Sequence, residues 1–412
     1  MYDAAPSSVS TKPALLFLCH RLPFPPPPDK GEKIRAFRIL EHLERNYRIK
    51  LGCFIDDEAD IPHVDTLRSH CETLDWFPRP PRNTKFKALA GLLKGEALSV
   101  ALFSSQRMKD WVEREIAREK PDVIFVYSSA MAQFVPASAL KDTRLIMDLV
   151  DVDSDKWRQY ATTAGFPMKW VYSREADKLL AFDRGVAASA NASIFVSDAE
   201  AALFRTLAPE AAATTHAIAN GVDCDYFSPA HGFVHPFDER GPNLVFTGTM
   251  DYRPNVDAVT WFASDIFPQI RRLKPSATFT IVGAKPTAEV TRLEERSGIT
   301  VTGRTPDVRP YLAAADAVVA PMRIASGIQN KVLEGMAMAK AVITTPQGLE
   351  GIDAVPDRHL LLAETADDFV NAVLHLNPVT ATALGHAARQ LMEEHYGWTA
   401  RLGALDRLLH KG

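Results

Sequence analysis

Short apolar runs alternate with amphipathic helical patterns along nearly the whole chain, and this alternation constrains the fold more than any other feature. In the first half, candidate strands lie at Ala14–Cys19, Ile49–Phe54, Val123–Tyr127, Arg144–Leu149, Ser193–Val196 and His216–Ala219. The helical patterns between them are Glu32–Glu44, Gln106–Lys120, Lys169–Ala190 and Asp198–Leu207. Strands bounded by turns and separated by helices are typical of a parallel sheet covered on both faces.

The same alternation begins afresh after a polar loop, Asp223 to Pro242, which contains turn residues throughout. Strands are predicted at Leu244–Thr247, Phe279–Val282, Ile299–Thr302, Ala317–Ala320 and Val342–Thr344, and helices at Val256–Leu273, Ala288–Arg296, Val308–Ala314 and Asn330–Ala339. Only helices are expected after Leu361, the last of them at Gly397–His410. The sequence therefore predicts an α/β protein with two doubly wound parallel sheets, and ligands that bind beyond the carboxyl ends of the strands.

Composition narrows the class of protein. Hydrophobic residues make up 46% of the 412 residues and charged residues 24%, which is typical of a globular chain. The 47 Lys and Arg residues do not outnumber the 51 Asp and Glu residues, so no basic domain for nucleic acid is expected. Four cysteines without a C-x-x-C pair exclude a disulfide scaffold and a structural zinc site. Cys19 and Cys53 lie in apolar runs that are expected to be strands, where a reduced, buried thiol is usual, so a cytoplasmic location is expected. We found no apolar run long enough to span a membrane and no signal peptide.

The strongest local signal follows the predicted strand Ala317–Ala320. A loop containing Gly327 leads into a helix from Asn330, and Lys331 and Glu334 are three residues apart, on one face near its amino end. A helix amino terminus favours a phosphate, to which Lys331 can add a positive charge. Glu334 can accept hydrogen bonds from two ribose hydroxyls. A solvated ion pair on the helix surface is the simpler alternative.

Three segments of the chain resemble glycosyltransferase family 4. They are Ala219-Asn-Gly-Val-Asp223 with Phe227-Ser-Pro229, then Asn330-Lys-Val-Leu-Glu-Gly-Met-Ala337, then Gly348-Leu-Glu-Gly-Ile352. More narrowly, Cys19-His-Arg-Leu-Pro-Phe-Pro25 with Asp29-Lys-Gly-Glu-Lys-Ile-Arg35 resembles sugar transferases of bacterial exopolysaccharide clusters that are associated with the exosortase sorting system.

The resemblance implies the GT-B fold, in which two Rossmann-like domains face a central cleft and the second mainly holds the nucleotide-sugar. The expected domains are an acceptor-binding domain at residues 1–225, a nucleotide-sugar-binding domain at 226–392, and a terminal helix at 393–412 that crosses back onto the first. The implied reaction is transfer of a sugar from a nucleotide diphosphate to a glycan or lipid-linked acceptor, with retention of anomeric configuration. No cofactor and no metal are expected.

Carried over by position, Glu334 matches the glutamate that binds the ribose, and Lys331 lies near the diphosphate. The family's other glutamate falls at Ser326, a departure that assigns the donor sugar to the backbone of Ser326, Gly327 and Ile328. Many relatives have Gly-Arg after the strand at Leu244–Thr247, where this chain has Gly248 and, further on, Arg253. Arg253 is thus a candidate for the missing charge, or a plain surface arginine. The residues expected to bind the donor are Gly31, Gly248, Arg253, Ser326, Gly327, Ile328, Asn330, Lys331 and Glu334.

The acceptor side is expected at the first sheet. His20 and Arg21 follow its first strand, and Lys30 and Lys33 flank Gly31, which resembles the family's glycine loop or simply begins a helix. Asp151 and Asp153 follow another strand, where many relatives carry a catalytic histidine; helix capping by Asp153 or Ser154 is the alternative. The candidate acceptor-side residues are His20, Arg21, Lys30 and Asp153, and the candidate catalytic residues are Lys331, Glu334, Asp151 and Arg253.

The stretch from Trp76 to Lys94 is basic and contains no acidic residue. It is expected either to contact the inner face of the plasma membrane, where a polyprenyl-linked acceptor would reside, or to be a solvated helix. Two other functions stay open: a non-catalytic protein that binds nucleotide-sugar or glycan, and a sugar-nucleotide epimerase. A nicotinamide-dependent dehydrogenase is disfavoured, because neither half has Gly-x-Gly-x-x-Gly after its first strand.

Overall fold

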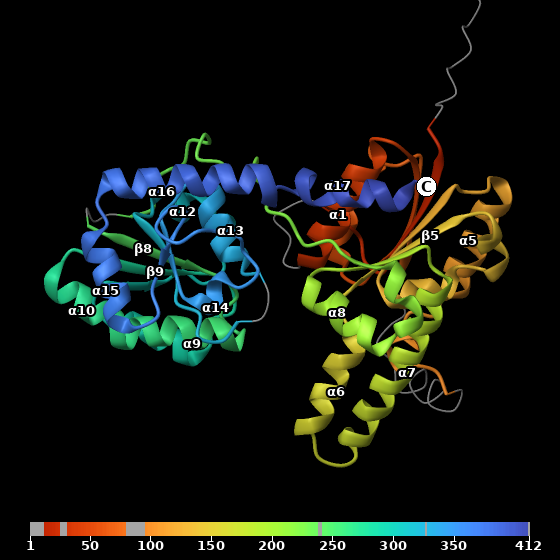
Figure 1. Ribbon diagram of the computed structural model, residues 1–412, viewed down its shortest axis with the longest axis horizontal. Coiled ribbons are helices and arrows are strands. Elements are labelled where there is room, and N and C mark those ends of the chain that lie inside the picture. The colour runs from red at the N-terminus through yellow and green to blue at the C-terminus, as the bar shows by residue number, and fades with distance from the viewer. Residues whose placement is uncertain (1–11, 25–30, 80–94, 238–240, 326–327, 411–412) are drawn as a thin grey trace, which may run out of the picture. The chain divides into compact units, whose positions relative to one another are not determined.

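The computed structural model describes residues 12–24, 31–79, 95–237, 241–325 and 328–410. The chain forms two compact units, one comprising Met1–Ala219 with Leu402–Gly412 and the other Asn220–Arg401. Each unit is built around its own parallel sheet, with helices packed against it (Figure 1).

Unit 1 contains a seven-stranded sheet with the strand order β3-β2-β1-β4-β5-β6-β7, and every pair in it is parallel. Apolar residues fill the central strands because both of their faces are covered, and β1 and β4 are buried along their whole length. The strands are β1 (Ala14–Cys19), β2 (Arg48–Ile55), β3 (Thr73–Pro78), β4 (Val123–Tyr127), β5 (Arg144–Val150), β6 (Ala192–Phe195) and β7 (Thr215–Ala217).

Helices connect these strands and cover the sheet. The α-helices of unit 1 are α1 (Gly31–Glu44), α2 (Val64–Arg68), α4 (Leu98–Ala101), α5 (Gln106–Arg118), α6 (Asp153–Thr163), α7 (Met168–Ser189) and α8 (Asp198–Leu207). Short 3₁₀ helices are η1 (Glu58–His63), η2 (Ser129–Phe134), η3 (Ala137–Lys141) and η4 (Pro209–Thr214).

Unit 2 contains a six-stranded parallel sheet with the order β10-β9-β8-β11-β12-β13. Its strands are β8 (Asn243–Thr247), β9 (Thr278–Val282), β10 (Ile299–Val301), β11 (Ala317–Ala320), β12 (Val342–Thr344) and β13 (Leu361–Leu362). The sheet lies between a layer that contains α9 and α10 and a layer that contains α13 and α16 (Figure 1).

The helices of unit 2 follow the same alternation. They are α9 (Arg253–Trp261), the π-helical segment η5 (Phe262–Ile266), α10 (Phe267–Leu273), α11 (Ala288–Thr291), η6 (Arg292–Glu295), α12 (Arg309–Ala314), α13 (Asn330–Ala337), α14 (Pro346–Leu349), α15 (Ala366–His375), α16 (Pro378–Leu391) and the π-helical segment η7 (Met392–Tyr396).

The last helix, α17 (Trp398–Leu409), begins in unit 2 and ends in unit 1. Within unit 1 its end is fixed by two contacts: Asp406 Oδ1 lies 2.8 Å from His42 Nε2, and the Leu408 carbonyl accepts from Arg144 Nε at 2.5 Å. Among the described residues, no helix is long and apolar enough to cross a membrane.

The two predicted parallel sheets are confirmed, and α8, β1, β4, β11 and β12 have their predicted bounds. Several details were wrong, among them the following. Trp76 to Pro78 belong to β3, so the basic stretch does not begin as a helix, and residues 80–94 lie outside the described residues. The predicted helix Val256–Leu273 is interrupted by η5, and a short strand, β13, lies where only helices were expected.

Candidate functional site

The carboxyl edge of the unit 2 sheet is where the strongest predicted residues meet. The loop that leaves β11 is held by two threonines of the neighbouring strand end: Thr344 Oγ1 donates to the Ala320 carbonyl at 2.9 Å, and Thr345 Oγ1 donates to the Met322 carbonyl at 2.6 Å. This loop leads into α13, whose first residue is Asn330. The side chain of Gln329 does not cap α13, so the helix begins with backbone N–H groups that a ligand can use.

Lys331 is on the first turn of α13 and is only 9% exposed. Its Nζ lies 5.4 Å from the centroid of the Phe246 ring, near the end of β8, and donates to Gln329 Oε1 at 3.3 Å. Burial lowers the pKa of Lys331 to about 8, and the nearby Glu334 carboxylate limits the decrease. Lys331 is therefore a desolvated cation whose charge a bound anion would stabilise.

Glu334 lies one turn further along α13 and is partly buried. Burial raises its pKa, while Lys331 and the hydroxyl of Thr247 oppose the rise. Among the described residues, no ion pair joins Lys331 and Glu334 directly, so the solvated surface pair considered above does not describe them. Titratable groups whose pKa values are displaced by burial, and which lie at the carboxyl ends of parallel strands, are typical of ligand sites.

Two glycines let the backbone approach closely beside these residues. Gly248 follows β8 with φ +157°, and a Cβ on it would lie 2.6 Å from Asn255 Nδ2. Gly283 follows β9 with φ +156°, and its Cβ would lie 1.7 Å from the Gly248 carbonyl oxygen. Asn255 Nδ2 in turn donates to the Thr249 carbonyl at 2.9 Å. The turn after β8 is thus fixed by packing, and side chains are excluded at both glycines.

Arg253 begins α9, directly after this turn, and its side chain is exposed. A second arginine that the sequence did not single out, Arg323, follows β11 and forms a bidentate pair with Asp257 at 2.6 and 3.0 Å. Arg323 also lies 5.1 Å from the Trp261 ring centroid. Arg323 is therefore committed to internal contacts, whereas Arg253 is positioned at the sheet edge where a ligand phosphate could be reached.

The sequence also missed a cluster around Tyr226. Arg309, the first residue of α12, lies 3.8 Å above the Tyr226 ring and forms a bidentate pair with Asp307 at 2.8 to 3.0 Å. Burial raises the pKa of Tyr226, and both Asp307 and Glu334 add to the rise through their negative charge. Tyr226 thus connects the segment after residue 220 with the α13 site. Its 83-residue separation from Arg309 left no local sequence signal.

The predicted donor residues are therefore only partly brought together. Lys331, Glu334 and the β8 turn with Gly248 lie at the carboxyl edge of the unit 2 sheet, and Asn330 is exposed there. Ile328 packs against Gly351: a Cβ on this glycine would lie 3.0 Å from Ile328 Cγ1. Ser326 and Gly327 lie outside the described residues, as does Lys30 on the acceptor side. Gly31 belongs to unit 1, where it is the first residue of α1.

Two of the acceptor-side candidates in unit 1, His20 and Arg21, are held by internal contacts, as is the nearby Lys33. His20 is buried and stacks on Tyr127 with centroids 5.7 Å apart. Arg21 Nη2 lies 3.4 Å from Asp56 Oδ2. Lys33 is buried and bonds Asp60 at 2.5 Å. These contacts fix the side chains at the carboxyl edge of the first sheet.

Asp151 and Asp153 follow β5 in a turn of unusual geometry. Val150 has φ +70°, and its N–H donates to Asp148 Oδ1 at 3.1 Å. Asp148 also accepts from the buried Arg35 Nε at 2.9 Å. Both Asp151 and Asp153 pair with Lys156, at 2.6 and 3.0 Å. No group of three His, Cys, Asp or Glu residues among the described residues is arranged to hold a metal ion.

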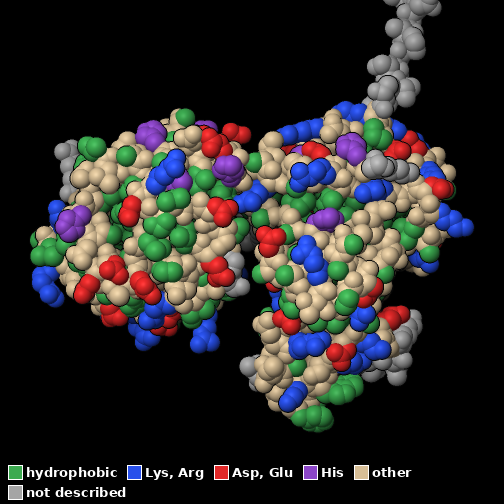
Figure 2. Space-filling view, in the orientation of Figure 1, with side chains coloured by type: hydrophobic (Ala, Val, Ile, Leu, Met, Phe, Trp, Pro, Cys, Tyr) green, Lys and Arg blue, Asp and Glu red, His purple; other side chains and the backbone are tan. Residues whose placement is uncertain are grey.

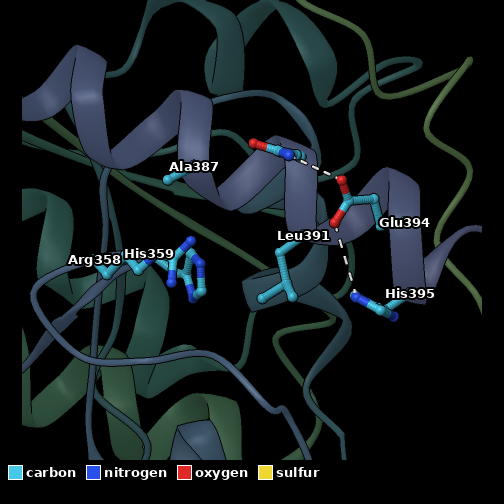
Figure 3. Close-up of a pocket in the computed structure, with 7 residues that line it drawn as sticks. Arg358, His359, Ala387, Leu391, Glu394 and His395 are labelled. Atoms are coloured by element: carbon cyan, nitrogen blue, oxygen red, sulfur yellow. Dashed lines mark hydrogen bonds and ion pairs between the residues drawn. The ribbon is translucent and has the colours of Figure 1, made fainter.

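A separate polar cavity of about 230 Å³ lies elsewhere in unit 2 (Figure 3). Its lining includes His359, Leu391, Glu394 and His395, and Glu394 accepts from Gln390 Nε2 at 2.8 Å. His359 precedes β13, so this cavity is at the amino-terminal edge of a parallel strand, opposite to the edge that carries Lys331. It is therefore not part of the α13 site.

Comparison with known proteins identifies the architecture. Residues 241–377 match the family model described as glycosyl transferases group 1. The sequence has no significant match among curated proteins. The matched segment lies within unit 2 and includes all six strands of its sheet.

Solved structures extend the likeness to the whole chain. HepE from Anabaena, solved in complex with UDP, has a TM-score of 0.63 at 14% identity, covering 96% of this chain and 99% of that one. Sucrose-phosphate synthase from Thermosynechococcus elongatus has a TM-score of 0.62 at 18% identity, with the same coverage. A variant of TarM from S. aureus, solved with fondaparinux, alpha-GlcNAc-glycerol and UDP, has a TM-score of 0.60 at 11% identity, covering 97% and 100%. The fold of this chain is GT-B, which it shares with these structures.

Proposed function

We propose that this chain is a retaining glycosyltransferase, of the family 4 type, that transfers a sugar from a nucleotide diphosphate to a glycan or a lipid-linked acceptor in bacterial exopolysaccharide synthesis. One observation carries the proposal. Lys331 and Glu334 lie side by side, desolvated, on the first turns of the helix that follows β11, and both have pKa values displaced toward the neutral form.

The diphosphate is assigned to Lys331 and the amino end of α13. A bound diphosphate would stabilise the charged form of Lys331 and accept hydrogen bonds from the first backbone N–H groups of the helix. The same groups would stabilise the charge that develops on the leaving diphosphate during transfer, which is the usual source of electrostatic catalysis. Arg253 is the candidate for a second positive charge, from the start of α9.

The ribose is assigned to Glu334. A carboxylate in this position can accept hydrogen bonds from two adjacent hydroxyls, and such bonds would favour its ionised form over the neutral form that burial favours. Tyr226, whose ring packs against the Arg309 guanidinium, contributes a hydroxyl near the same carboxylate. UDP is the first nucleotide to test, because the HepE and TarM structures contain it.

The proposed reaction is a front-side attack. The bond between the anomeric carbon and the diphosphate oxygen breaks, the acceptor oxygen bonds to the same face, and the departing diphosphate takes the acceptor proton. No protein nucleophile is required. Asp151 is the candidate in unit 1 for orienting the acceptor hydroxyl, and its pair with Lys156 would have to open for this role.

The experiment is calorimetric titration with UDP, GDP, ADP and CMP, using wild type, Lys331→Met and Glu334→Gln. Lys274→Met and Glu364→Gln, both exposed in unit 2, are the matched controls. We expect one nucleotide to bind, each site variant to lose at least about tenfold in affinity, and the controls to bind as wild type, because desolvated charged contacts contribute about 2 kcal/mol or more. Unchanged affinity in both site variants would overturn the assignment.

A turnover assay then distinguishes a transferase from a protein that only binds the nucleotide-sugar. The second possibility stays open because Ser326 occupies the position of the family's other glutamate. The corresponding nucleotide-sugar is incubated with a polyprenyl phosphate or a glycan, and the product is followed by NMR. A new bond with the donor's anomeric configuration supports the proposal. Tight donor binding without any transfer would favour a binding protein, and inversion at the second carbon of the sugar would identify an epimerase.

A further inference from the structure

Helices α6 and α7 form an antiparallel hairpin that projects from the body of unit 1 (Figure 1). Four residues, 164–167, join them. Three aromatic side chains hold the hairpin together: the Trp157 ring centroid lies 5.8 Å from that of Tyr160 and 5.4 Å from that of Tyr172, and the two tyrosines are 6.2 Å apart. The hairpin is thus a packed element with a defined tip.

The tip exposes large hydrophobic side chains that the fold leaves uncovered. Phe166 is 91% exposed, Trp170 57%, Tyr160 54% and Met168 42%, and Pro167 beside them is exposed as well. Figure 2 shows hydrophobic side chains gathered at the end of this projection. Single exposed hydrophobic residues are ordinary, but a group confined to the apex of one hairpin marks an interaction site.

Toward the tip, the charged residues of the hairpin are all basic. From Lys156 to Arg174 the sequence contains four basic residues, the others being Arg158 and Lys169, and no acidic residue. The acidic partners lie behind them: Asp151 and Asp153 pair with Lys156, and Asp177 lies 3.7 Å from Arg158. Lys169, exposed beside Trp170, is the basic residue nearest the apex.

We propose that the α6–α7 tip, defined as Tyr160, Phe166, Pro167, Met168 and Trp170, inserts into the interfacial layer of an anionic lipid bilayer. Trp and Tyr favour the headgroup region, an apolar apex enters the acyl boundary, and basic residues behind it meet anionic headgroups. A stable protein partner is the weaker occupant, because such interfaces bury about 20 to 30 residues a side, whereas this apex is narrow and convex.

The inference goes beyond the proposed transfer reaction and does not depend on it. The tip is in unit 1 and contains none of the residues assigned to the donor. It also differs from the sequence expectation, which offered the stretch from Trp76 to Lys94 for membrane contact, with a solvated helix as the alternative.

The experiment is co-sedimentation of the full chain with vesicles of phosphatidylcholine alone and of phosphatidylcholine with phosphatidylglycerol. Wild type is compared with the double variant Phe166→Ser/Trp170→Ser, with Lys169→Glu, and with the control Leu273→Ser, which removes a hydrophobic side chain 61% exposed in unit 2. Because Phe166 and Trp170 project into solvent, circular dichroism should show the double variant folded.

We expect wild type and the control to bind the anionic vesicles, the double variant to lose at least about tenfold in partitioning, and Lys169→Glu to lose severalfold. Brominated lipids should quench the tryptophan fluorescence of wild type, because Trp170 enters the bilayer. In the Trp170→Phe variant the remaining tryptophans should show little quenching. Equal binding by wild type and the double variant would overturn the proposal. So would an absence of vesicle binding together with self-association that the double variant abolishes in ultracentrifugation, which would assign the tip to a second copy of the chain.

Discussion

The carboxyl edges of the two sheets carry similar side chains that are neutralised in different ways. In unit 1, Arg35 pairs with Asp148 at 2.9 Å and Lys33 with Asp60 at 2.5 Å, and all four side chains are buried. In unit 2, Lys331 and Glu334 lie near one another without such a pair, and burial displaces both pKa values toward the neutral forms. Burial also raises the pKa of Asp148 in unit 1, but there the paired Arg35 guanidinium opposes the rise.

This difference distinguishes ion pairs that stabilise the fold from charged side chains that are positioned to bind a ligand. A buried ion pair with good geometry leaves little for a ligand to gain, and removal of one partner leaves an uncompensated charge. A desolvated charge without a matching partner costs stability in the unliganded protein, and a ligand that supplies the partner recovers that free energy. The following predictions test this contrast.

The largest effect is expected for Asp148→Asn. The substitution leaves the Arg35 guanidinium buried without its counter-charge, and it also weakens the contact that holds the Val150 turn. We expect unit 1 to lose about 3–5 kcal/mol in its free energy of unfolding, measured in urea by circular dichroism. Asp142→Asn, in the exposed pair with Lys120, should cost less than about 1 kcal/mol. Equal losses in the two variants would contradict the structural role of the buried pair.

Lys331→Met should act in the opposite direction on stability. The unfolded chain keeps the Lys331 proton up to a pH near 10.5, whereas the folded protein releases it at about 8. Stability of wild type should therefore rise between pH 8 and 10.5, because the unfolded state binds more protons in this range. We expect Lys331→Met to be more stable than wild type at pH 7, by up to about 3 kcal/mol, and to lack this rise in urea titrations. A variant that is less stable at pH 7 would show that Lys331 is structural.

Asp183→Asn tests a buried carboxyl in unit 1 that is not in an ion pair. Asp183, on α7, accepts from the Ser129 hydroxyl; burial raises its pKa to about 7, and Asp153 and Glu175 add to the rise. The folded state therefore binds more protons than the unfolded state between pH 4 and 7, so wild-type stability should fall as the pH rises through this range. We expect Asp183→Asn to remove most of this decrease, about 2 kcal/mol, in thermal unfolding at pH 5 and 8. The exposed Asp65→Asn should retain it.

Arg309→Lys is expected to have the smallest effect. Lysine keeps the charge but loses the bidentate pair with Asp307 and the planar contact with Tyr226. If Tyr226 helps to define the ribose site, nucleotide affinity in calorimetric titration should fall about fivefold, corresponding to about 1 kcal/mol for a cation–π contact. Arg272→Lys, on the exposed surface of α10, should bind as wild type. Equal nucleotide affinity in the two variants would show that the Tyr226 cluster stabilises the fold and takes no part in nucleotide binding.

Elements dominated by local pattern could be predicted from the sequence, and elements that depend on distant partners could not. β11 is a buried apolar run between turns, and its bounds were predicted. β3 was missed because Asp75 interrupts its apolar pattern; the carboxylate of Asp75 accepts from Trp111 Nε1 at 2.6 Å, a partner 36 residues away. α6 was missed because it is polar and packs mainly against α7.

The same limit applies to the site. The three-residue spacing of Lys331 and Glu334 on a helix start predicted their placement together, since that geometry is local. Spacing could not show that Lys331 is buried against Phe246, because β8 ends 84 residues earlier in the chain than Lys331. Nor could it join Tyr226 to Arg309. Distances through space between separate strand ends were needed for both.

The return of α17 to unit 1 has a consequence for the order in which the protein can be made. Unit 2 is one continuous segment, Asn220–Arg401, so it is complete once this segment has been synthesised. Most of unit 1 precedes unit 2 in the chain, but its contacts from His42 to Asp406 and from Arg144 to Leu408 can form only after all of unit 2 has been synthesised. Of the two units, the one that begins earlier is therefore completed later, and while unit 2 is being synthesised the surface that receives the end of α17 is open to other proteins.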